Sequence, residues 1–297
     1  MSKYAREVTS LISHPPVVTP EQSTLAIWLV RKYSSLTYIR RMSAIFANFV
    51  GGYEDFARQK TGDVSFYREN LARFYSYRAL LAEGIDRIEN GYPIGYASIY
   101  QGCFFIDSFS GRYLSEYSDT FEEIGYRSSA SPTGLFAWAD VATKMGGRVS
   151  RTVSADWPIQ LLLTMAEPPF PPADRQQTPT MTSGARVETG KDVPASGIWV
   201  PTTFPAACPN YLWAGREAPP AERAVKRLDR PPFPGPKGME PARVDYVYEK
   251  ESTIWQLVWE DRRYAGGRPP APEEADYLSS ETDPPAWPPV QPPPRPE

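Results

Sequence analysis

Residues 19–52 have the sequence TPEQSTLAIWLVRKYSSLTYIRRMSAIFANFVGG, and this stretch decides the fold of the first half of the chain. Its opening is typical of a helix N-terminus, with Thr19 as the N-cap, Pro20 as the first helical residue and Gln22 closing a capping box. Apolar side chains then recur at helical spacing until Gly51-Gly52, where the glycine pair predicts the end of the helix. Basic residues off this stripe, such as Lys32, are expected on the solvent side.

Three further helices are predicted downstream of this one. Asp63 is a candidate cap for a helix that ends at Asn90-Gly91. Another helix is expected from about Tyr96 to Ile124, and a last one from Ser131-Pro132 to Gly146-Gly147. Four amphipathic helices with polar connections predict an antiparallel helical bundle over residues 19–166, behind an N-terminal extension of residues 1–18.

Proline divides the chain, because only 6 of its 33 prolines fall within residues 1–165 and proline breaks helix interiors. A Pro/Thr-rich linker is expected at residues 167–183, a smaller β-rich, loop-rich module at 184–265 and a proline-rich arm at 266–297. Within the module, short strands are predicted at 186–189 and 197–200, and a β-hairpin at 243–249 and 252–260. Residues 161–163 form a short buried segment, helix or strand. The predicted fold class is therefore α+β.

Composition argues against most catalytic chemistry. His14 is the one histidine and lies in Ser-His-Pro-Pro within the extension, where nothing is expected to hold an imidazole rigidly. No Gly-rich phosphate loop occurs, and two cysteines are too few for a zinc site, so buried free thiols are expected. We therefore expect no catalytic residue, metal or cofactor.

Charge and hydropathy bear on the partner and the compartment. The net charge of −3 does not favour direct nucleic-acid binding. No apolar run is long enough for a membrane span, and the N-terminus lacks the apolar region of a signal peptide. A cytoplasmic protein that does not contact membranes is the expectation.

One cluster of acidic residues is a candidate binding surface for a basic partner. Its members fall mostly on one side of the third predicted helix: Glu116, Asp119, Glu122 and Glu123. Glu54-Asp55 is a weaker example of the same pattern. A solvated helix face is the usual explanation for such residues, whereas the functional interpretation is electrostatic steering of a partner protein.

Two loop segments combine turn residues with aromatic anchors. In the first, Gly190 and Gly197 allow positive φ, Pro194 stiffens the turn and Trp199 is a large apolar anchor. In the second, a proline-containing turn leads into a short apolar strand that breaks at Gly215, and its notable residues are Cys208, Asn210, Tyr211 and Trp213.

Together these segments, GKDVPASGIW at residues 190–199 and CPNYLWAG at 208–215, resemble large immunity proteins of bacterial polymorphic toxin and type VI secretion systems, of the kind called immunity protein 71 or 72. The helical half resembles that family in pattern only. The resemblance implies a non-enzymatic protein that binds a cognate toxin acting in the cytoplasm and occludes its active site. It implies no catalytic residue.

Two other functions remain open. An adaptor or chaperone would hold a non-catalytic region of a secreted effector, so it would bind the effector without protecting cells from it. A carboxylate-dependent carbohydrate-active enzyme would need two facing carboxyl groups in an aromatic-lined cleft. The chain has no motif for such a cleft.

Overall fold

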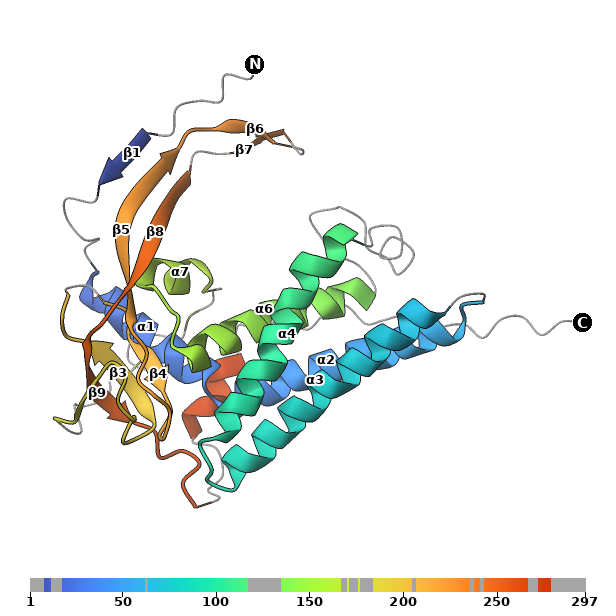
Figure 1. Cartoon of the computed structure of the whole chain (residues 1–297), viewed down its shortest axis with the longest axis horizontal. Helices are drawn as coiled ribbons and strands as arrows, with labels where there is room; N and C mark the ends of the chain where they lie inside the picture. Colours follow the sequence, from blue (N-terminus) through green and yellow to red (C-terminus); the bar gives the residue numbers. More distant parts are fainter. Residues whose placement is uncertain are drawn as a thin grey trace, which may run out of the picture. The chain divides into compact units, whose positions relative to one another are not determined.

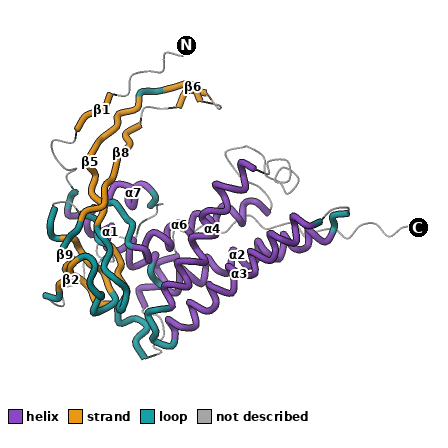
Figure 2. The backbone as a smooth tube through the Cα atoms, viewed as in Figure 1, coloured by secondary structure: helices purple, strands orange, loops and turns teal. Residues whose placement is uncertain are grey.

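The structure is a computed structural model that describes residues 8–11, 18–61, 64–116, 135–166, 170, 176, 184–204, 207–235, 238–240, 243–266 and 272–278. Helices predominate in the first half of the chain and antiparallel strands in the second, which confirms the predicted α+β class (Figure 2).

Contacts divide the chain into two units, each assembled from separate stretches. Unit 1 comprises residues 1–30, 155–166 and 172–260, and unit 2 comprises residues 31–154, 167–171 and 261–297. Helix α1, Pro20–Tyr33, passes from the first unit into the second. The boundary predicted at the proline-rich segment divides the chain into consecutive stretches. Each of these units instead combines stretches that lie far apart in the sequence.

Unit 2 is built around four helices: α2 (Leu36–Arg58), α3 (Ser65–Glu89), α4 (Gly95–Glu116) and α6 (Leu135–Ser154). Helix α2 packs on α3 and α6, and α4 packs on the same two helices from its own side, so the four close into a bundle (Figure 1). The short helix η1, Pro272–Leu278, also packs on α2. Aromatic side chains fill the α2–α3 seam, where Phe49 and Tyr53 contact Phe74 edge to face.

The single helix predicted for residues 19–50 is two helices, because Ser35 begins a new one. The Ser35 side chain accepts a hydrogen bond from the backbone N–H of Tyr38, which satisfies a donor of the first turn of α2. The predicted stop at Gly51-Gly52 is wrong, since both glycines lie inside α2. Lys32 was expected in solvent but is buried, with its ammonium group over the rings of Tyr33 and Tyr38.

The other helix boundaries are partly as predicted. Helix α3 ends at Glu89 with Asn90 as its C-cap, whereas Asp63 lies outside the described residues and Val64 occupies the N-cap position. Residues 117–134 are also outside them. Helix α6 runs through Gly146-Gly147 to Ser154, so the stop predicted there is wrong. The segment at 161–163 is helical, within α7 (Ile159–Thr164).

Helices α3 and α4 are in close backbone contact where two glycines face each other. A Cβ added at Gly84 would lie 2.7 Å from the carbonyl oxygen of Gly95, and one at Gly95 would lie 2.5 Å from the carbonyl oxygen of Gly84. No side chain fits in that space, so this pair sets the separation of the two helices.

Unit 1 contains an antiparallel four-stranded sheet in the order β2-β9-β3-β4: Arg186–Glu188, Ile254–Glu260, Gly197–Pro201 and Asn210–Leu212. One face of it buries Trp199, Trp255 and Leu257 together with Ala155 and Val187. The strands predicted at 186–189 and 197–200 are therefore present, but they do not pair with each other. Strand β9 lies between them.

The predicted hairpin at 243–260 is wrong. Strand β8, Arg243–Glu251, pairs with β5, Ala221–Arg230, in a long two-stranded ribbon, whereas β9 belongs to the other sheet (Figure 1). A tight two-residue hairpin turn requires residues that adopt positive φ, and Lys250-Glu251, at the predicted turn, instead continue β8 as extended strand. The chain passes to β9 beyond them, and Thr253 N–H donates to the Thr189 hydroxyl.

One short strand extends the ribbon to a three-stranded sheet, and two others form a separate pair. Strand β1, Val8–Leu11, pairs antiparallel with residues 226–229 of β5, and β6 (Phe233–Gly235) pairs with β7 (Gly238–Glu240). The N-terminal extension predicted for residues 1–18 thus contributes an edge strand.

Candidate functional site

The acidic cluster predicted from the sequence falls largely outside the described residues. Asp119, Glu122 and Glu123 lie in the range 117–134, and Glu116 is the last residue of α4, with no side-chain position described. The hypothesis of a basic partner at these residues stays a prediction.

The second acidic pair is partly neutralised by its own helix. Glu54 and Asp55 both lie within ion-pair distance of Arg58 one turn later, at 2.5 and 3.6 Å. Glu54 also accepts a hydrogen bond of 2.6 Å from the hydroxyl of Tyr75 on α3, and this bond raises the pKa of Tyr75. Glu54 thus joins two helices of the bundle instead of facing an aromatic-lined cleft.

The two loop segments singled out in the sequence lie side by side. Strands β3 and β4 pair Gly197 with Leu212 and Trp199 with Asn210, and the turn before β3 is hydrogen-bonded to the turn after β4 through Val193 N–H and the Arg216 carbonyl. Gly190 has φ +84°, as its predicted role requires, and Gly215 has φ +85°. Pro194 lies in a bend between them.

Gly197 does not have the positive φ that was predicted. It lies inside β3, and a Cβ there would be 2.1 Å from the carbonyl oxygen of Trp259 on β9. Glycine is needed at this position because two backbones meet without space for a side chain.

Asn210 carries most of the polar contacts of these segments. Its side chain accepts from Trp157 N–H at 3.0 Å and donates to the Trp157 carbonyl at 3.1 Å, in a buried environment. Tyr211 and Trp199 are buried, and Trp213 lies beneath the guanidinium of Arg216. These residues hold the sheet together, so they offer little surface to a partner.

Both cysteines are free and buried, as predicted. Burial, with a smaller contribution from Glu222, raises the pKa of the Cys208 thiol well above its ordinary value. A thiol kept protonated is a poor nucleophile.

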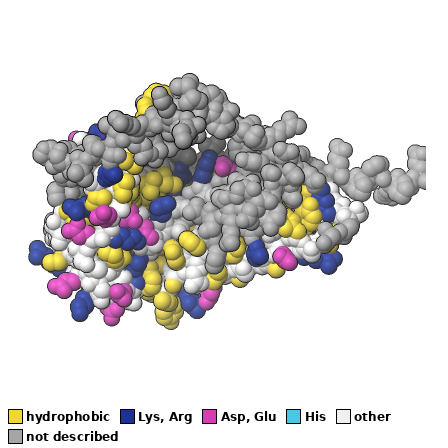
Figure 3. Space-filling view, turned by 45° about the horizontal axis from the view of Figure 1, so that its top comes forward, with side chains coloured by type: hydrophobic (Ala, Val, Ile, Leu, Met, Phe, Trp, Pro, Cys, Tyr) yellow, Lys and Arg dark blue, Asp and Glu magenta, His cyan; other side chains and the backbone are white. Residues whose placement is uncertain are grey.

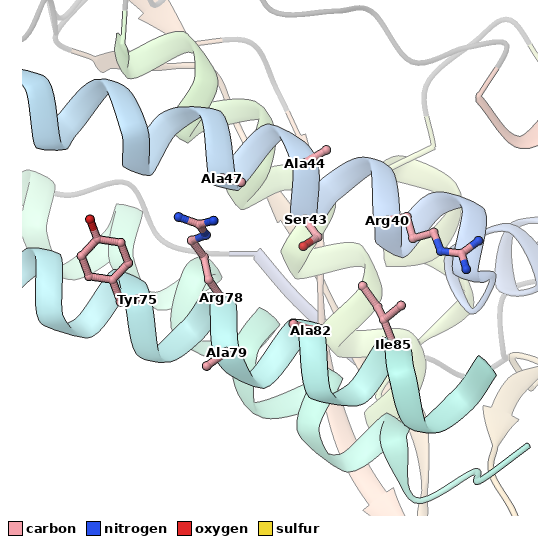
Figure 4. Close-up of a pocket in the computed structure, with 9 residues that line it drawn as sticks. All are labelled: Arg40, Ser43, Ala44, Ala47, Tyr75, Arg78, Ala79, Ala82 and Ile85. Carbon is pink, nitrogen blue, oxygen red and sulfur yellow. The ribbon is translucent and has the colours of Figure 1, made fainter. Parts of the chain in front are cut away.

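The structure places an open groove between α2 and α3 in unit 2 (Figure 4). The groove has a volume of about 660 Å³. Its lining consists mostly of small residues at helical spacing, flanked by larger ones: Ser43, Ala44, Ala47, Ala79 and Ala82, with Arg40, Tyr75, Arg78 and Ile85. Small side chains on both helices leave the space open, and Figure 4 shows Ser43 and Arg78 directed toward the gap from facing helices. We call these nine residues the α2–α3 groove.

A polar link joins the two helices near each end of the groove. At one end Arg40 of α2 pairs with Glu89 of α3, and beyond the other end Tyr75 donates to Glu54. Along α3, the lining extends from Tyr75 to Ile85, which is about 15 Å at the helical rise per residue. Between the links, the alanines are too short to reach across.

Arg78 is the one charged side chain in the middle of this lining. No carboxylate of the described residues pairs with it, and its guanidinium lies 5.9 Å from the centre of the Tyr75 ring. The α2–α3 groove thus combines an apolar floor with a positive charge that lacks a counter-ion in the described part of the chain. This arrangement suits an anionic group attached to an apolar surface.

Other classes of site find less support among the described residues. No three His, Cys, Asp or Glu side chains of that part of the chain are grouped so that they could hold a metal ion. None of its helices is long and apolar enough to cross a bilayer. On the face shown in Figure 3, Lys and Arg side chains lie among Asp and Glu side chains.

Sequence reasoning missed the α2–α3 groove because its signal is the absence of large side chains. Arg40 falls off the apolar stripe of its helix, which is equally typical of an ordinary solvated face. The sequence does show alanines at helical spacing, at positions 44 and 47 and at positions 79 and 82. Only the packing of α2 on α3 brings these two pairs of alanines into one groove. Comparisons of the chain with protein-family models, with curated proteins and with solved structures gave no match.

Proposed function

We propose that this protein is an immunity protein, which binds a cognate toxin in the cytoplasm and neutralises it by occluding the toxin's active site. The toxin is expected to belong to a type VI or related polymorphic toxin system, as the resemblance of residues 190–199 and 208–215 implies. No catalytic residue is needed for this function, because inhibition by occlusion requires only affinity and shape.

The observation that carries the proposal is the α2–α3 groove. Most of its lining residues are exposed, including Ala44, Ala79 and Ala82, and Tyr75 is 42% exposed. Small-molecule sites bury most of their ligand's surface, whereas a groove open along two helices suits a segment of another protein. Helices α2 and α3 have 23 and 25 residues, long enough to support such an interface.

The test is a growth assay in which the chain is expressed with the product of the adjacent reading frame, the candidate toxin. Protection of the cells, together with a stable complex in size-exclusion chromatography, is the expected result. The matched control is a chain in which the groove is filled by Ala79→Leu and Ala82→Leu, which should fold but protect less.

The adaptor interpretation has a different outcome in the same assay. An adaptor would form the complex and still leave cells sensitive to the isolated toxin domain, since it would hold a region away from the active site. Complex formation without protection would therefore replace the proposed function with that alternative.

The acidic cluster offers a second test of the proposal. If Glu116, Asp119, Glu122 and Glu123 help to hold a basic toxin surface, reversing all four to Lys should slow association, most strongly at low ionic strength. Single exposed charges contribute only about 0.2–1 kcal/mol each, so the four are changed together. An unchanged association rate at low salt would remove these residues from the interface.

A further inference from the structure

From the α2–α3 groove we infer the chemistry of the segment that it binds: an amphipathic helix of the partner protein with a small apolar face and at least one carboxylate placed to meet Arg78. This inference rests on the proposed function, because the helix is taken to belong to the toxin. To that function it adds the kind of segment recognised, an acidic amphipathic helix, and the residue that selects it, Arg78.

The α2–α3 groove holds a positive charge in its middle and no carboxylate of its own. Neither Asp nor Glu is among its nine lining residues. Arg40 already has Glu89 as a partner, and Glu54 is shared between Arg58 and Tyr75, so both ends are compensated. Arg78 in the middle has no carboxylate partner among the described residues. A bidentate carboxylate is the anion that best matches the planar guanidinium.

The shape of the groove favours a helix as its occupant. Alanines on both walls allow a docked helix to approach closely, as small residues do at tight helix–helix contacts. The lining covers about 15 Å of α3, which corresponds to roughly ten residues of a docked helix. Ile85 near one end and Tyr75 near the other offer apolar contacts to that helix (Figure 4).

An anionic small molecule is the competing occupant, because arginine, serine and tyrosine also bind phosphate groups. The exposure of the lining argues against it. Arg40, Arg78, Ala79 and Ala82 are all exposed, so a small ligand would keep much of its surface in water.

The first experiment measures binding directly with a defined probe. A fluorescently labelled 14-residue helical peptide, with alanine and leucine on one face and glutamates beside that face, is titrated with the full chain and followed by anisotropy. Saturable binding is expected, and Arg78→Glu should weaken it about tenfold at low salt, with a smaller effect at 0.5 M salt. The same peptide with glutamine in place of glutamate should bind more weakly, and a lysine version should bind Arg78→Glu better than the natural chain.

Matched variants separate the groove from general surface charge. Arg68→Glu changes an exposed arginine of the same helix outside the groove and should leave the dissociation constant within about twofold. Ala79→Leu fills the floor and should reduce binding, whereas Ala72→Leu, also exposed on α3 and outside the groove, should not. No saturable binding to the natural chain, or equal losses in Arg68→Glu and Arg78→Glu, would overturn the inference. So would binding of inorganic phosphate or a mononucleotide in place of the peptide.

A second experiment places Arg78→Glu in the growth assay with the adjacent reading frame's product. Weaker protection by Arg78→Glu but not by Arg68→Glu supports the inference. If the complex forms and protects equally well with Arg78→Glu, the groove inference fails while the proposed function stands. If the peptide binds but the chain gives no protection, the groove stands as an acidic-helix site and the proposed function fails.

Discussion

Gly197 and Gly51 are both glycines inside regular elements, yet they respond oppositely to a methyl group. At Gly197 the added Cβ would lie 2.1 Å from the Trp259 carbonyl oxygen, whereas at Gly51 nothing lies within 4 Å. Gly197→Ala is expected to destabilise the protein by at least about 3 kcal/mol through backbone displacement. Gly51→Ala should stabilise it by about 1 kcal/mol, because alanine is the better helix former. Urea denaturation measures both, and equal signs for the two variants would contradict this account.

Tyr53 is expected to link stability to alkaline pH. Burial raises the pKa of Tyr53 to about 12, with a smaller opposing effect from the hydrogen bond donated by Asn70. The folded pKa exceeds the ordinary value of about 10, so the contribution of the neutral phenol is complete below pH 10 and is lost as the pH rises toward 12. The loss from this residue amounts to roughly 3 kcal/mol.

Tyr53→Phe removes that titration and tests the link. The free energy of unfolding of the variant should fall less steeply between pH 10 and 12 than that of the natural chain, while the two change in parallel below pH 9. Curves that remain parallel up to pH 12 would show that Tyr53 does not couple to folding.

At the scale of elements, the link between β4 and residues 155–158 depends on one side chain. Asn210→Ala would leave the buried N–H and carbonyl of Trp157 without their partners, at an expected cost of about 2 kcal/mol or more. Asn90→Ala is the matched control, because that asparagine caps α3 at an exposed position. Its loss should cost only about 0.5 kcal/mol, the low end for an ordinary hydrogen bond, because water replaces the partner at an exposed site. Thermal unfolding of the two variants compares the positions, and equal shifts would contradict the role given to Asn210.

The helices were predictable from the sequence because their apolar spacing is a local property, but their ends were not. Ser35 begins a helix with its own side chain, a signal present in the sequence that the continuous apolar stripe conceals. Gly51-Gly52 was expected to end α2, yet Tyr53 beyond it is buried against Phe74, and that packing outweighs the preference of glycine for turns.

Strand pairing was less predictable, because it depends on partners far away in the chain. Strand β5 has the sequence AERAVKRLDR, whose charged residues favour a helix or loop on propensity alone. It is a strand because β8 pairs along its length, and Arg223 forms an ion pair of 2.8 Å with Glu251 across the ribbon. The α2–α3 groove was hard to predict for the same reason. Ala44 and Ala82 line one groove only because α2 and α3 pack together.

At the scale of the whole molecule, residues 261–266 and 272–278 complete the helical unit. The Glu274 carboxylate is buried and accepts hydrogen bonds from Tyr264 and from the Thr37 hydroxyl at the start of α2. Tyr264 in turn accepts from Leu36 N–H. Arg263 pairs with Asp261, both almost fully buried, and donates to the Ser34 hydroxyl and the Arg31 carbonyl.

A fragment ending at the predicted linker is therefore expected to be unstable. Residues 1–166 expressed alone would lack Arg263, Tyr264 and Glu274, so the first turn of α2 would lose buried partners. Its helical circular dichroism should melt at a lower temperature than that of the full chain, or the fragment should fail to accumulate.

Glu274 variants separate the loss of these contacts from truncation itself. In the full chain, Glu274→Ala should destabilise by about 3 kcal/mol and Glu274→Gln by less, because the amide keeps one acceptor. A fragment of residues 1–166 as stable as the full chain would refute the account.

The contact between Arg263 and Ser34 also has a consequence for synthesis on the ribosome. The two residues are 229 positions apart. At roughly 5–20 residues per second, Ser34 would be synthesised about 10–45 seconds before Arg263. During that interval the backbone N–H groups of Leu36 and Thr37 lack their native acceptors, and α2 lacks its contact with η1. The first turn of α2 therefore gains its native buried partners only after Arg263, Tyr264 and Glu274 have been synthesised.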